Sequence, residues 1–82
     1  MDLIEAFGRV VRRDRQRRGL TQEQLAELAD LHTNYVSLVE RGRSAAALDT
    51  LAALAEALGR RPSQLLRAAE REMAHRDESP SE

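Results

Sequence analysis

The chain has 82 residues, no cysteine, one phenylalanine, one tyrosine and a formal net charge of −1. This length accommodates one small domain, whose core must consist mainly of leucine, alanine and valine. The absence of cysteine excludes disulfides, thiolate catalysis and cysteine-based metal sites. His32 and His75 have no partners at metal-ligand spacing, so we expect no metal site and no cofactor.

No apolar run approaches the roughly 20 residues of a membrane span, and no signal peptide begins the chain. We therefore expect a soluble, cytoplasmic protein that does not contact the membrane. No pattern in the chain indicates a small-molecule ligand.

The arginines are unevenly distributed along the chain. All 13 basic residues are arginine, and six lie in one ten-residue stretch: Arg9, Arg12, Arg13, Arg15, Arg17 and Arg18. The acidic residues gather later in the chain, notably at Glu70, Glu72, Asp77, Glu78 and Glu82. A nearly neutral total can therefore hide one basic face, although an ordinary solvated helix surface explains the same pattern.

The first three predicted elements are helices. Apolar residues between positions 3 and 11 have helical spacing, and Gly19 ends this segment. Thr21 begins a second helix, with Gln24 as its capping-box partner. A third helix is expected at about 33–41, where Gly42 ends it in a left-handed conformation.

Two further helices complete an all-α fold with five helices. The fourth is expected at 48–58, with one apolar stripe made of Leu48, Leu51, Leu54, Ala55 and Leu58. The fifth begins at Pro62 and extends to about residue 76. Its apolar side consists of Leu65, Leu66, Ala69 and Met73. The domain should therefore span 1–76, and the polar residues 77–82 should form a disordered tail.

Residues 21–42 are arranged as two short helices joined by a tight corner. This is the layout of a helix-turn-helix, whose second helix lies in the DNA major groove. Because Val36 and Val39 should point inward, the residues expected to read bases are Thr33, Asn34, Ser37, Leu38 and Arg41. Asparagine can bridge adenine, arginine can bind guanine through two hydrogen bonds, and leucine can contact a thymine methyl. The alternative, an ordinary solvated surface, does not explain an exposed leucine.

Four residues around this helix are expected to contact phosphates. Gln22 lies in the first turn of the second helix, where backbone N–H groups favour an anion. Arg43 and Ser44 follow Gly42 and could bind the next phosphates. The Tyr35 ring could instead pack against the second helix, with only its hydroxyl reaching DNA. The alternative for Gln22 and Arg43 is a solvated polar side chain without a ligand.

Three segments of the chain resemble the lambda-repressor-like family, also called the XRE or Cro type. They read LTQEQLA, LHTNYVSLVERG and LxxLAxALG, and the resemblance covers about residues 7–66. It implies a phosphate contact at Gln22 and base contacts from the third helix at Thr33, Asn34, Ser37 and Leu38. It also implies a structural ion pair between Arg15 and Glu40, which would suit bidentate geometry.

The chain departs from the family pattern at three positions. Asp30 stands at the corner where glycine is usual, although Asp tolerates left-handed geometry. Asp14 replaces an apolar residue, so it could join a charge network with nearby arginines. His32 stands where a Ser or Thr cap is common, which leaves Thr33 as an alternative cap.

A single module of this kind contacts too few base pairs for specific binding in a genome. We therefore expect a homodimer on a double-stranded, pseudo-palindromic operator. The expected interface is the apolar side of the fifth helix, at Leu65, Leu66, Ala69 and Met73. The alternative is packing of this side within the monomer, and Leu65 in particular suits the core.

The pattern HxxYxSxxERG in the third helix resembles restriction-modification controller proteins, which activate or repress transcription. RNA polymerase is then a candidate partner. Phage-type repressors and autoregulating antitoxins remain open. A different class is a protein-interaction module that keeps the fold without binding DNA, such as an antirepressor or an assembly subunit. An enzyme is not expected, because the sequence lacks a nucleophile–base pair, a metal cluster and a phosphate loop.

Overall fold

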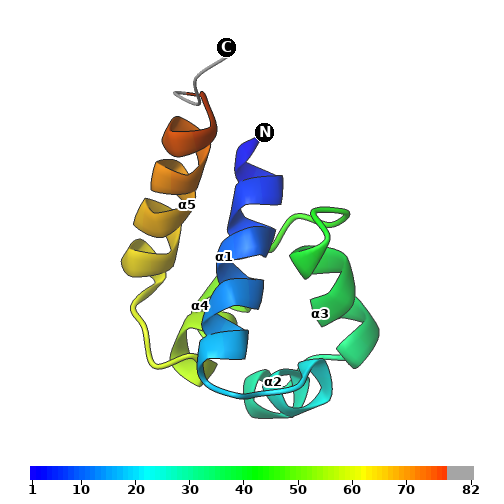
Figure 1. Ribbon diagram of the computed structural model, residues 1–82. Coiled ribbons are helices and arrows are strands. Elements are labelled where there is room, and N and C mark those ends of the chain that lie inside the picture. Colours follow the sequence, from blue (N-terminus) through cyan, green and yellow to red (C-terminus); the bar gives the residue numbers. More distant parts are fainter. Residues whose placement is uncertain (78–82) are drawn as a thin grey trace.

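The computed structural model describes the backbone of residues 1–77 and the side chains of residues 1–75. This part of the chain forms five helices and no strand, which confirms the predicted all-α fold (Figure 1). The helices are α1 Leu3–Arg17, α2 Gln22–Ala29, α3 Thr33–Glu40, α4 Leu48–Ala57 and α5 Pro62–Asp77. Of the tail predicted at 77–82, Asp77 ends α5 and the rest lies outside the described residues.

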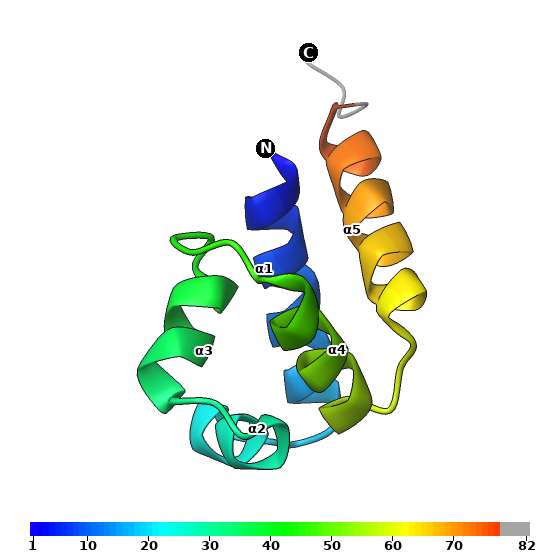
Figure 2. The same ribbon diagram turned by 180° about the vertical axis from the view of Figure 1, so that it is seen from behind.

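Helix α1 occupies the middle of the fold. Figures 1 and 2 show α5 along one side of α1 and α3 on the other side, with α2 across the base. The core between the helices is aliphatic, as the composition predicts. Its largest fully buried side chains are Leu25, Leu54, Leu58, Leu65, Val10, Val11, Val36 and Val39.

The helix ends follow local sequence signals. The predicted capping box at α2 is present: the Gln24 N–H donates to Thr21 Oγ1 at 3.0 Å, and the Thr21 N–H donates to Gln24 Oε1 at 2.8 Å. Asp30 takes the left-handed conformation, with φ of 59°, at the turn between α2 and α3. The short side chain of Asp tolerates this conformation, so the corner forms without glycine.

Two sequence predictions about helix starts are wrong. Thr33 does not cap α3, because it is already the first helical residue; His32 holds the N-cap position without a side-chain hydrogen bond. Leu48 does not join the apolar stripe of α4, since 82% of its surface is exposed. It is the first residue of α4 and lies one turn before Leu51, the first residue of the helix that reaches the core.

Helices α1 and α3 approach each other very closely at Gly8. A Cβ atom on Gly8 would lie 2.2 Å from the carbonyl oxygen of Val39 and 2.8 Å from that of Glu40. Glycine is therefore required at this point of α1. The close approach places α1 directly beside the carboxyl end of α3.

Candidate nucleic-acid interface

Helix α3 presents one accessible face. Val36 and Val39 are each 1% exposed and hold the other face against the core. All five side chains predicted to read bases keep accessible surface: Asn34, Leu38 and Arg41 are exposed, and Thr33 and Ser37 are half-buried. Leu38 has 38% of its surface exposed, so it adds aliphatic surface to this face.

The far end of this face is formed by Arg41. Its backbone ends α3, and its Nε donates to the Ser37 carbonyl oxygen at 3.3 Å. The guanidinium therefore lies along the same face as Ser37. Amide, hydroxyl, guanidinium and aliphatic groups follow one another along the helix, which is the mixture of donors, acceptors and apolar surface that base edges require.

The Arg15–Glu40 ion pair implied by the family resemblance is present. Arg15 Nε donates to Glu40 Oε2 at 2.6 Å, and Arg15 Nη2 donates to Glu40 Oε1 at 3.1 Å. The side chains are 11% and 2% exposed, respectively. Arg15 Nη1 also donates to the Leu20 carbonyl oxygen at 2.8 Å. Such bidentate, largely buried pairs have strong directional preference, so the pair locks the relative position of α1 and α3.

Gln22 joins the same cluster. Its Nε2 donates to Glu40 Oε1 at 3.1 Å, which connects the first turn of α2 to the last turn of α3. An amide nitrogen carries two hydrogens, so one donor remains in addition to this bond. The cluster therefore orients Gln22, which is predicted to bind a DNA phosphate, relative to α3, which is predicted to read bases.

Of the other three residues predicted to bind phosphate, Tyr35 lies within α3, and Arg43 and Ser44 lie in the segment that follows it. The Tyr35 ring packs against the core, and its hydroxyl donates to the Ala45 carbonyl oxygen at 3.3 Å. Tyr35 thus braces the loop that carries Arg43 and Ser44. Arg43 is exposed, whereas Ser44 is half-buried.

The dimer interface predicted on α5 requires a correction. Leu65 and Ala69 have no exposed surface, because this side of α5 packs against α1 within the monomer. They cannot contribute area to an interface with a second copy. Leu66 keeps 36% of its surface exposed, and Met73 is half-buried. Only these two of the four residues are accessible to a partner.

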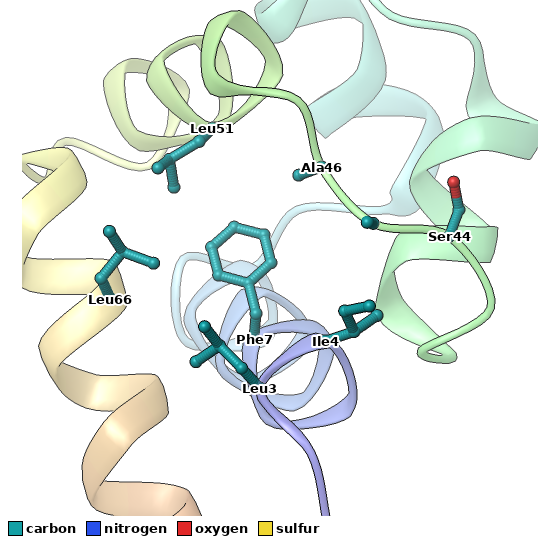
Figure 3. A pocket seen from close by; sticks show the side chains of 8 residues that line it. Leu3, Ile4, Phe7, Ser44, Ala46, Leu51 and Leu66 are labelled. Atoms are coloured by element: carbon teal, nitrogen blue, oxygen red, sulfur yellow. The ribbon is translucent and has the colours of Figure 1, made fainter.

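Leu66 borders an apolar cavity that sequence reasoning did not identify. The cavity measures about 230 Å³, and its lining side chains gather around the ring of Phe7 (Figure 3). Leu3 and Ile4, from the first turn of α1, are 43% and 41% exposed at its edge. The sequence contains a signal for this cavity: the apolar stripe of α1 begins at Leu3 and Ile4, one turn before Phe7, where the buried part of the stripe begins.

The predicted charge network at Asp14 is also present, although its main partner comes from a distant segment. Arg60, between α4 and α5, donates from Nη1 to Asp14 Oδ2 at 2.9 Å. Arg17 lies 3.7 Å from the other carboxylate oxygen. Within residues 1–75, no three His, Asp or Glu side chains gather as metal ligands, and none of the five helices is long and apolar enough to cross a membrane.

Comparisons with known proteins agree with this arrangement. A helix-turn-helix family model matches residues 11–65. The chain is 42% identical over 66 residues to the control protein C.SmaI of Serratia marcescens, covering 80% of this chain and 79% of that protein.

Two solved structures are similar in both fold and sequence. The clp gene regulator ClgR from Corynebacterium glutamicum superposes with a TM-score of 0.90 at 34% identity, covering 94% of this chain and 82% of that one. The restriction-modification controller protein C.AhdI from Aeromonas hydrophila gives a TM-score of 0.74 at 40% identity, covering 76% of this chain and 94% of that one.

Proposed function

This chain belongs to the helix-turn-helix family of DNA-binding transcription regulators, and we propose that it binds a pseudo-palindromic operator as a homodimer. The observation that carries the proposal is the accessible face of α3. The Arg15–Glu40–Gln22 cluster fixes the position and orientation of α3 relative to the start of α2. In each copy, α3 enters the major groove. Half-sites then lie about one helical turn, roughly 34 Å, apart.

The base-reading residues of this proposal are Thr33, Asn34, Ser37, Leu38 and Arg41. Gln22, Arg43 and Ser44 bind phosphates on either side of them, while Tyr35 supports the loop between α3 and α4. Phosphate contacts set the position of the protein on the duplex, and base contacts determine which sequence is preferred. The two groups of residues should therefore respond differently to substitution.

Selection of bound duplexes from a random DNA pool tests this function directly. We expect one enriched motif with two-fold symmetry. Asn34→Ala should relax base preference at one position of each half-site and cost about 1–3 kcal/mol at that position. Gln22→Ala should instead weaken operator and scrambled DNA by the same factor. No enriched motif at low salt would favour a protein-interaction module that keeps the fold without binding DNA.

For the homodimer, we propose an interface formed by the accessible apolar residues at the start of α1 and on the outer side of α5. These are Leu3, Ile4, Leu66 and Met73. Exposed leucine and isoleucine side chains gathered around one cavity form a surface that a second copy can cover. A two-fold axis through this surface would place the same residues opposite one another.

Sedimentation velocity tests the interface. Leu66→Arg should shift the protein from dimer to monomer without loss of helical content. Leu28→Arg is the matched control, because Leu28 is 61% exposed on α2, outside this apolar surface. A dimer that survives Leu66→Arg but dissociates with Leu28→Arg would locate the interface on α2 instead.

We further propose a controller role within a restriction-modification system, acting on transcription of the protein's own operon. The identities to C.SmaI and C.AhdI support this role. RNA polymerase is then the partner in activation. Transcription in vitro from DNA upstream of the gene, with purified polymerase and increasing protein, should first rise or fall and then saturate as the operator fills. Unaltered transcription at saturating protein would exclude autoregulation.

A further inference from the structure

The structure divides the six arginines of residues 9–18 into distinct environments. Arg15 binds Glu40, Arg13 lies 3.0 Å from Glu72, and Arg17 lies 3.7 Å from Asp14. The guanidinium of Arg18 lies against Gly59, where a Cβ atom would be 2.4 Å from Nη2. Within the described part of the chain, Arg9 and Arg12 are exposed and form no ion pair or side-chain hydrogen bond, and unlike Arg18 they lie on the side of α1 that faces α3.

Arg9 and Arg12 lie three residues apart on α1 and share one shallow groove of about 320 Å³. The groove runs between α1 and the carboxyl end of α3, where its other lining residues are Glu5, Glu40 and Arg41. Arg41 also forms the end of the accessible face of α3. The arginine groove, defined as Arg9, Arg12 and Arg41, is therefore continuous with the base-reading face.

The balance of charge in the arginine groove is positive. The Glu40 carboxylate is already bound by Arg15 and Gln22. Glu5 takes part in the capping box of α1, where Oε1 lies 3.4 Å from the Asp2 nitrogen. Three guanidiniums thus face the Glu5 carboxylate, which forms no ion pair within the described residues. An exposed guanidinium keeps several donors in a planar fork that matches phosphate oxygens.

The close contact at Gly8 determines where these arginines lie relative to DNA. It brings α1 against the last carbonyl groups of α3. Arg9, the next residue of α1, therefore lies near the carboxyl end of α3, the helix proposed to enter the DNA major groove. The major groove is about 12 Å wide and bordered by phosphates on both sides. A helix of eight residues is about 12 Å long, so its carboxyl end reaches toward one of these borders.

We infer that Arg9 and Arg12 bind phosphates of the DNA strand beyond the carboxyl end of α3, so that α1 is part of the DNA interface. This inference rests on the proposed docking of α3 and extends it. The contacts carry no sequence information, since guanidinium–phosphate bonds are the same for every base pair. They increase affinity and make it more dependent on salt.

The test compares Arg9→Gln, Arg12→Gln and the double variant with Arg71→Gln. Arg71 is the matched control because it is exposed on α5 and lines the groove on the other side of α1. Each single variant removes one positive charge per chain, so effects of net charge alone should be equal among the three single variants. Affinity for the selected operator is measured by fluorescence anisotropy between about 50 and 200 mM salt.

Each phosphate contact contributes about 0.9 to the slope of log K against log salt. A dimer carries each substitution twice, so Arg9→Gln and Arg12→Gln should each lower the slope by about 1.8. Operator and scrambled duplexes should lose affinity by the same factor. Arg9→Lys and Arg12→Lys should retain most of the slope because they retain the charge.

The contrary result is a slope in Arg9→Gln and Arg12→Gln that equals the slope in Arg71→Gln. A lower melting temperature combined with that unchanged slope would also overturn the inference, because the arginines would then only stabilise the carboxyl end of α3 through its helix dipole. Failure of the proposed function would be distinguishable from failure of this inference, because the unsubstituted protein itself would then show no preference for any duplex.

Discussion

Removing Arg15 should strongly destabilise the fold, because it leaves Glu40 charged and buried. The Glu40 side chain is 2% exposed, and Arg15 supplies two of its three hydrogen bonds. Breaking a buried pair from one side costs about 3–5 kcal/mol. Gln22 still donates to Glu40 in Arg15→Met, so we expect the lower end, about 3 kcal/mol.

In a domain of this size, 1 kcal/mol lowers the melting temperature by about 4–8 °C. Arg15→Met should therefore melt roughly 12–24 °C lower than the unsubstituted protein. Urea and thermal unfolding followed by far-UV circular dichroism give both quantities. Protein concentration is kept constant between variants, since dimerisation adds to apparent stability.

The double variant Arg15→Met/Glu40→Leu separates the buried charge from the loss of the pair. Replacing both partners by apolar residues of similar volume is often neutral or stabilising. The double variant should consequently be more stable than Arg15→Met alone. A cost below about 1 kcal/mol for Arg15→Met, typical of an exposed ion pair, would refute the reasoning, and so would additive effects of the two substitutions.

Three further substitutions test the backbone and the surface by the same unfolding measurements. Gly8→Ala should destabilise by at least about 1 kcal/mol despite the better helix propensity of alanine, because the new methyl would overlap the carbonyl oxygens of Val39 and Glu40; a stabilised variant would show that α1 and α3 separate easily. Asp30→Gly should stabilise by about 0.5 kcal/mol, since relief of the left-handed backbone at φ of 59° exceeds the added flexibility of the unfolded chain; a destabilised variant would assign Asp30 a favourable side-chain role. Leu48→Gln should change stability by less than about 0.5 kcal/mol because the side chain is 82% exposed, and a larger loss would place Leu48 in an interface.

The helices were predictable because their signals are local. A capping box needs only Thr21 and Gln24, a left-handed helix end needs only Gly42, and an apolar stripe repeats within one helix. The accessible face of α3 was predictable for the same reason. Once Val36 and Val39 are assigned to the core, the helical period determines which neighbours remain outside.

The Arg15–Glu40 pair belongs to an intermediate category. Its partners are 25 residues apart, so no helical period connects them. The family resemblance identified them, and the structure added the third member, Gln22. Without the resemblance, a buried glutamate beside Val39 would have indicated only that some cationic partner was needed.

The amino-acid sequence by itself determined the five helices and the outward face of α3, because these depend on residues within one or two turns of each other. Only the tertiary structure decided which apolar residues of α5 remain accessible: α5 lies against α1, which buries Leu65 and Ala69 and leaves Leu66 at the surface. It likewise divided the arginines of α1 between ion pairs and the arginine groove, since the partner of Arg15 comes from α3 and that of Arg13 from α5. Packing between distant segments sets these environments, and a periodic pattern within one helix carries no information about that packing.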